Sequence, residues 1–83
     1  MKIETKYNVG DRIWVVYEHQ GEVCVYDDYI GWITYDKDLF YTTKESCADR
    51  KEDEIILYDD GKGLITKIKE LMSEIHEREE GNN

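Results

Sequence analysis

The sequence of 83 residues contains no proline and no long apolar run. Its turns therefore depend on glycine and aspartate, which readily adopt turn conformations. No stretch approaches the roughly 18 apolar residues that a membrane-spanning helix needs. The residues that follow Met1 also lack the apolar block of a signal peptide, so we expect a cytosolic protein with no membrane partner.

Cysteine is scarce, since Cys24 and Cys47 are the only two in the chain. Two cysteines do not form a disulfide framework, which favours free thiols in a reducing compartment. With His19 and His76 they are the only candidates for a thiol enzyme or a zinc site, but their spacing has no paired CxxC or HxxxH pattern. The segment 60–63 is too short for a phosphate-binding loop. We expect no enzyme activity, no metal and no cofactor.

Basic residues are also few: 20 Asp and Glu oppose 11 Lys and Arg, which gives a net charge of −9. Residues 18–60 hold 13 acids and 4 bases, so this middle part of the chain accounts for the whole excess. Direct nucleic-acid binding is not expected, because it depends on clustered Lys and Arg that displace counterions. Solubility is one explanation of the negative charge, and recognition of a basic protein surface is another.

Short β-type segments occupy most of the chain. We expect five strands, at residues 12–17, 22–26, 29–35, 39–43 and 54–58. Gly10 is expected to take a positive φ at the turn before the first strand, and residues 18–21 form the first hairpin turn. Asp27-Asp28 is expected to interrupt the sheet, and Gly31 to bend the third strand. Residues 44–53 have no apolar period and are predicted to form a solvent-facing loop.

The last segment changes to a helical period. Its apolar residues form one stripe, at Leu64, Ile65, Ile68, Leu71, Met72 and Ile75. Asp59 and Asp60 precede the stripe and can cap the helix. Acidic residues after Arg78 oppose the helix dipole, so the pattern predicts a helix over 60–78 and a frayed tail over 79–83. The stripe covers the sheet or pairs with a second copy, and a homodimer through the helix or a sheet edge stays open.

These elements together predict one α+β domain over residues 1–83. The sheet occupies residues 10–58 and is either a strongly bent antiparallel sheet or a small, partly open barrel of about five strands. One C-terminal amphipathic helix packs on it. A chain of this length buries one modest core and leaves little interior for an enzyme cleft.

The opening Lys6-Tyr7-Asn8-Val9-Gly10-Asp11-Arg12-Ile13 resembles the start of small accessory proteins of phages and prophages of Gram-positive bacteria, which have a KYxxGDxV-type opening. The resemblance implies a small barrel of the Src-homology-3-like kind. It also implies an accessory protein that inhibits a host defence component by binding it in the host cell cytosol. The polar segment 44–53 and the long final helix differ from the usual layout of those proteins.

Acidic and aromatic residues follow one another through the predicted strands. The candidate binding surface consists of Asp27, Asp28, Tyr29, Trp32, Tyr35, Asp36, Asp38, Tyr41, Glu52, Asp53 and Glu54. Carboxylates spaced along a curved sheet can imitate a phosphate backbone, and aromatic side chains can anchor an interface. The expected partner is a host protein with a basic surface. The same residue types also suit turns and core packing, so a purely structural role stays open.

A second hypothesis is an oligomer that sequesters a small molecule or a nucleotide signal between aromatic side chains. Recognition of a nucleotide needs cationic groups near the ligand phosphates. The candidates are Arg12, Lys37, Lys44, Arg50 and Lys51.

Overall fold

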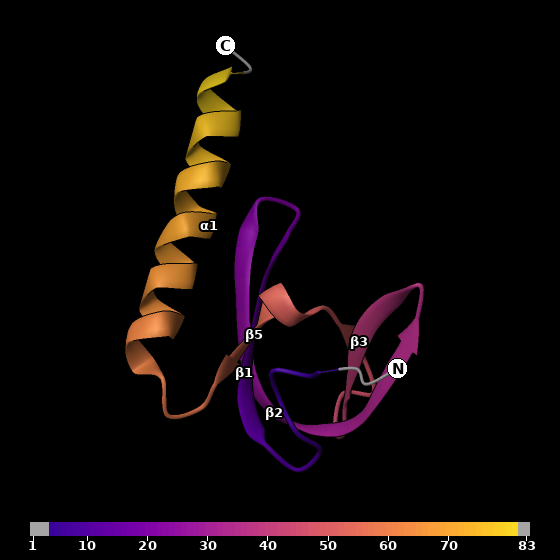
Figure 1. Cartoon of the computed structure of the whole chain (residues 1–83). Coiled ribbons are helices and arrows are strands. Elements are labelled where there is room, and N and C mark those ends of the chain that lie inside the picture. The colour runs from indigo at the N-terminus through magenta and orange to yellow at the C-terminus, as the bar shows by residue number, and fades with distance from the viewer. Residues whose placement is uncertain (1–3, 82–83) are drawn as a thin grey trace.

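A computed structural model, which describes residues 4–81, contains one open antiparallel sheet followed by a single α-helix (Figure 1). The strands are β1 (Arg12–His19), β2 (Glu22–Asp36), β3 (Asp38–Thr43), β4 (Asp49–Arg50) and β5 (Ile55–Leu57). A short 3-10 helix, η1 (Glu52–Glu54), precedes β5, and the helix α1 spans Gly61–Gly81. The strand order is β4-β3-β2-β1-β5. The predicted α+β class with five strands is confirmed.

The hairpin of β1 and β2 turns through two residues, so it is tighter than the turn predicted at 18–21, because Glu18 and His19 belong to β1. Gln20 and Gly21 have φ values of 51° and 83°, the positive angles that two-residue hairpin turns of type I′ require. Along β1 the buried side chains point to both faces of the sheet. Ile13 and Val15 belong to the main core, whereas Val16 is buried on the opposite face, toward α1.

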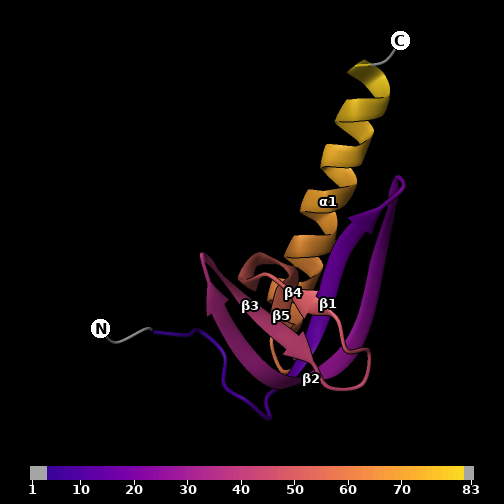
Figure 2. The same ribbon diagram turned by 90° about the vertical axis from the view of Figure 1, so that its right-hand side faces the viewer.

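The predicted interruption at Asp27-Asp28 is wrong, because β2 runs without a break from residue 22 to residue 36. Its first half pairs with β1 and its second half pairs with β3. The register shifts between Ile30 and Trp32, so the predicted bend at Gly31 is confirmed (Figure 2). A Cβ atom at Gly31 would lie 3.2 Å from the carbonyl oxygen of Thr42, so this close approach favours glycine.

Asp28 explains why the strand continues through two aspartates. Its side chain is 2% exposed and accepts hydrogen bonds of 3.0 Å from the backbone N–H groups of both Glu45 and Ser46. The Ser46 hydroxyl donates a further hydrogen bond of 2.8 Å. The carboxylate therefore fixes the segment after β3, and the loop predicted at 44–53 instead contains β4 and η1.

The main core lies inside the bend of the sheet. Its buried side chains are Tyr7, Ile13, Val15, Ile30, Tyr41 and Ile55. The Tyr7 hydroxyl donates a hydrogen bond of 2.7 Å to the carbonyl oxygen of Ile55. The Tyr41 hydroxyl accepts one of 3.1 Å from the Lys6 N–H and donates one of 2.7 Å to Glu52. These hydroxyls tie the segment before β1 across the core.

Helix α1 lies beside β1 and extends past the β1–β2 hairpin turn (Figures 1 and 2). Asp60 accepts a hydrogen bond of 3.0 Å from the Gly63 N–H, as expected of a cap. The frayed tail predicted at 79–83 differs from the structure: the helix continues through Gly81, and residues 82–83 lie outside the described residues. Arg78 pairs with Glu18 of β1, which holds the last turns near the sheet. Within residues 4–81 no helix is long and apolar enough to span a membrane.

Candidate functional site

Four members of the predicted binding surface serve the structure instead. Asp28 and Tyr41 are buried, and Glu52 accepts the hydrogen bond of Tyr41. Glu54 accepts a hydrogen bond of 3.0 Å from the Lys51 N–H and pairs with Arg50 at 3.5 Å. The expected exposure of Asp28 and Tyr41 is therefore wrong, because both are buried. Glu52 and Glu54 are half-buried, and each is already bonded to a neighbouring group of the protein.

The pKa of Asp28 reflects this structural role. Burial by itself would raise the pKa of the carboxyl group, because it disfavours the charged form. Hydrogen bonds from the backbone N–H groups of Glu45, Tyr29 and Ser46 and from the Ser46 hydroxyl outweigh burial and lower the pKa below its ordinary value. Asp28 is therefore ionised at neutral pH and bound to the protein's own backbone, so it is not available to a partner.

Three further members, Tyr35, Asp36 and Asp38, lie at the turn between β2 and β3. Asp36 and Asp38 are exposed on either side of Lys37, whose φ is 65°. Strand pairing places Trp32, Asp36 and Asp38 on one face of the β2–β3 ribbon, because residues opposite each other in an antiparallel pair share a face. Tyr35 pairs with Leu39 on the other face, and Asp53 is exposed on η1.

Tyr29 and Trp32 lie at the bend of β2 and are exposed there together with Val9, from the turn before β1. Val9, Tyr29, Trp32 and Lys44 contribute to the lining of a hollow of about 360 Å³. Leu57, at the end of β5, is also exposed and lines a second hollow of about 440 Å³ with Arg12. We name the four exposed apolar residues Val9, Tyr29, Trp32 and Leu57 the bend surface.

Arg12 lines the hollow that contains Leu57 and lies near Tyr29 of the other hollow. Its guanidinium lies 3.8 Å from the ring centre of Tyr58 and 6.0 Å from that of Tyr29. It donates a hydrogen bond of 2.9 Å to Asp27, and this bond raises the pKa of Arg12. The Trp14 ring stacks on Tyr58, with 5.0 Å between ring centres. Cation–π and stacking contacts thus join the end of β5 to the bend of β2.

Carboxylates lie close to these apolar side chains. Asp11 and Asp59 line the hollow that contains Leu57, and Asp27 holds Arg12. The arrangement has an apolar centre with acidic neighbours, which suits contact with a protein that presents an apolar patch among basic residues. Comparisons of the chain with protein-family models, curated proteins and solved structures find no match. The candidate site is therefore argued from the positions of its residues and not from a relative.

Sequence reasoning identifies Tyr29 and Trp32 but misses Val9 and Leu57. Both missed residues lie at the end of a turn or strand, where the apolar pattern does not distinguish a buried side chain from an exposed one. The sequence does contain one signal for the exposure of Val9, which is its place next to the turn glycine Gly10. The predicted positive φ of Gly10 is confirmed, with a value of 94°. A residue beside such a turn is exposed more often than one inside a strand.

The exposed carboxylates of residues 18–60 do not form one row. Those without an ion pair to another described residue are Glu22, Asp36, Asp38, Glu45, Asp49, Asp53, Asp59 and Asp60. They lie at strand ends, in η1 and in the connecting segments. The negative charge of the sheet part is therefore spread over several elements.

The cations that the nucleotide hypothesis requires are dispersed. Arg12 is paired with Asp27, and Arg50 is partly buried with its guanidinium 4.1 Å from the ring centre of Tyr17. Each of the four hollows described for residues 4–81 is lined by at most one Arg or Lys. One copy of the chain thus offers no cluster of cations to a nucleotide in these hollows.

The cysteines and histidines are also separated. Cys24 is partly buried in β2, whereas Cys47 is exposed after β3, and neither forms a disulfide. Among residues 4–81, no three His, Cys, Asp or Glu side chains are grouped so that they could hold a metal ion. Among the described residues, the bend surface is therefore our candidate for the functional site.

Proposed function

We propose that this chain is a non-catalytic binding protein that docks the bend surface onto a basic surface of a partner protein. The observation that carries the proposal is a hollow lined by the exposed Val9, Tyr29 and Trp32. The Tyr29 ring lies 6.0 Å from Arg12, which lines a second hollow with Leu57, Asp11 and Asp59. The resemblance of the opening to phage accessory proteins suggests the class of partner: a host defence component, bound in the host cell cytosol.

The two kinds of residue have different tasks in this proposal. Trp32 and Tyr29 are large and partly exposed, and aromatic side chains of this kind supply most of the affinity when an interface buries them. The surrounding carboxylates contribute less to affinity but accelerate association with a basic partner and disfavour acidic ones. A defence enzyme that handles nucleic acid presents such a basic surface.

The experiment compares two aromatic residues that are equally exposed. Trp32 is 53% exposed at the bend, and Tyr35 is 54% exposed near the β2–β3 turn on the other face of the ribbon. Tagged wild-type protein, Trp32→Ala and Tyr35→Ala are used to capture partners from a lysate of a Gram-positive host. Circular dichroism verifies that all three proteins are folded.

We expect Trp32→Ala to weaken capture of a specific partner by about tenfold or more, because interface tryptophans are frequent hot spots. Tyr35→Ala should retain that partner at the wild-type level. A partner that binds wild-type and Trp32→Ala equally well would show that the bend surface is not the docking site. Absence of any specific partner from the lysates of several hosts would argue against the binding function itself.

A further inference from the structure

The apolar stripe of α1 is covered on one side only. Leu64, Leu71 and Ile75 are partly buried toward the sheet, whereas Ile65 and Met72 are 55% and 58% exposed. Ile65 and Met72 are seven residues apart, which places them on the same flank of the helix. The sheet therefore leaves an apolar flank of α1 in contact with solvent.

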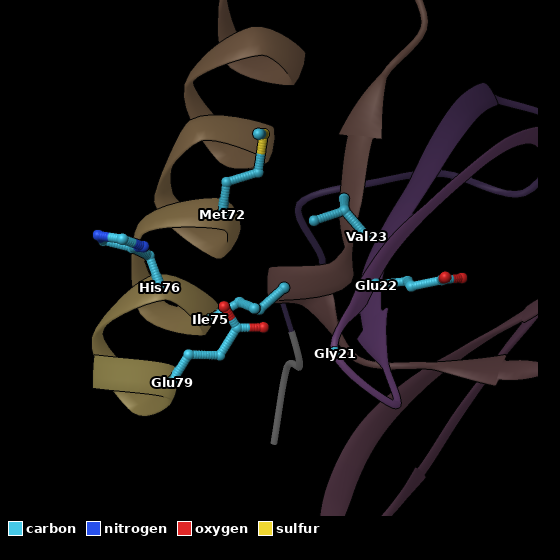
Figure 3. Close-up of a pocket in the computed structure, with 7 residues that line it drawn as sticks. All are labelled: Gly21, Glu22, Val23, Met72, Ile75, His76 and Glu79. Carbon is cyan, nitrogen blue, oxygen red and sulfur yellow. The ribbon is translucent and has the colours of Figure 1, made fainter. Parts of the chain in front are cut away.

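A groove continues this flank toward the β1–β2 hairpin (Figure 3). Met72 and Ile75 of α1 form one wall, and Gly21 of the hairpin turn and Val23 of β2 form the other. The groove has a volume of about 440 Å³, and Glu79 lies at its end toward the C-terminus of the helix. Met72, Ile75 and Val23 make part of its lining apolar.

The charges along α1 have an unusual order. Residues 61–69 contain Lys62, Lys67 and Lys69 and no acid, whereas residues 70–81 contain five Glu and only Arg78 as a base. A helix dipole favours acids at the N-terminus and bases at the C-terminus, so this order is the reverse of the stabilising one. The pair of Arg78 with Glu18 relieves it at one position only.

We propose that a second copy of this chain packs antiparallel against α1 and forms a symmetric homodimer. In that arrangement, Ile65 of one copy lies against Met72 of the other, and the basic half of each helix faces the acidic half of its partner. Lys62 then comes within about one helical turn of Glu79 across the interface. The contact is two-fold symmetric, so each favourable pair occurs twice.

The negative charge of the rest of the surface also makes α1 the most favourable face for self-association. Two copies repel each other wherever their acidic parts meet, and residues 18–60 carry 13 acids against 4 bases. Residues 61–83 carry five acids against four bases and are nearly neutral. The face of α1 is therefore the part of the molecule where a second acidic copy meets the least repulsion.

Antiparallel packing leaves the bend surface free. Helix α1 starts a few residues after β5, so its N-terminal end lies near the bend. The two bend surfaces of the dimer would thus lie toward opposite ends. Self-association does not depend on the proposed function, and Trp32→Ala is expected to dimerise like wild type.

Sedimentation equilibrium over a wide range of protein concentration tests the dimer. We expect Met72→Glu to raise the dimer dissociation constant about tenfold or more, because it puts a charge into the apolar contact. Thr66→Glu is the matched control: it adds the same charge to an exposed position about 100° around the helix from Ile65. Wild-type protein that stays monomeric up to about 1 mM would overturn the proposal.

Charge exchange tests the antiparallel direction separately. Lys62→Glu and Glu79→Lys each place like charges together in two symmetric positions, so each should weaken the dimer by about tenfold at low salt. The double variant restores both pairs with reversed sign and should recover most of the wild-type affinity. A double variant that is weaker than both single variants would contradict the antiparallel arrangement.

Discussion

At the scale of single residues, the same type of side chain has quite different tasks in this protein. Asp28 is buried and accepts hydrogen bonds from the segment after β3, whereas Asp27, its neighbour, is exposed and pairs with Arg12. Alternation along β2 explains the difference, because successive side chains point to opposite faces of the sheet. The sequence offers no sign of which aspartate is buried, since the donors to Asp28 lie 17 and 18 positions away.

Asp28→Asn is expected to destabilise the fold by about 2 kcal/mol at pH 7, because an amide replaces a charged acceptor and brings an N–H group toward backbone N–H donors. The pKa of Asp28 is lowered in the folded state, so its contribution is present above the unfolded pKa of about 3.9 and disappears as the pH falls through the folded value. The difference between wild type and Asp28→Asn should therefore become smaller in acid.

Urea denaturation at pH 7 and near pH 2.5 measures this difference. Asp36→Asn is the control, since Asp36 is exposed and its replacement should change stability by less than about 0.5 kcal/mol. An equal difference between wild type and Asp28→Asn at both pH values would show that the charge of Asp28 does not stabilise the fold.

At the scale of elements, the sequence pattern predicts those strands, turns and helices that interactions between near neighbours determine. The strand at β1, the hairpin turn before β2 and the apolar stripe of α1 follow from periodicity and from Gly10 and Gly21. The continuity of β2 and the short elements β4 and η1 were not predictable in this way. Asp28 accepts hydrogen bonds from Glu45 and Ser46, and Thr42 donates one to Asp49 of β4, while Tyr41 donates one to Glu52 of η1.

The β1–β2 turn offers a stabilising substitution. Gln20 has a φ of 51°, a left-handed conformation that asparagine adopts more readily than glutamine. Gln20→Asn creates an Asn-Gly turn and should raise the free energy of unfolding by about 0.5 kcal/mol. His19→Asn is the control, because His19 lies in β1 with an ordinary strand conformation. Thermal unfolding compares the two, and equal midpoints would contradict the explanation.

At the scale of the whole molecule, the negative charge surrounds the sheet while the helix is nearly neutral. Asp36 and Asp38 share a face with Trp32, so they are the exposed acids best placed to act with the bend surface. Glu70 and Glu77 are exposed on α1 and lie on the side of the helix away from Met72.

Two double variants therefore separate local charge from total charge. Asp36→Asn/Asp38→Asn and Glu70→Gln/Glu77→Gln both remove two negative charges. We expect the first to weaken binding to the captured partner about threefold to tenfold and to reduce its salt dependence, and the second to have a smaller effect. Titration at several salt concentrations measures both, and equal effects would attribute the charge contribution to the net charge alone.

The sequence by itself determined the fold class, the position of the bend and the existence of an amphipathic helix, because periodicity and turn chemistry act between near neighbours. Tertiary structure decided which acids are buried, which aromatic residues are exposed and how much of the helix the sheet covers. Those outcomes depend on contacts between distant segments, such as Asp28 with Ser46 and Arg12 with Tyr58. No local pattern records such contacts, because they join residues that are far apart in the sequence.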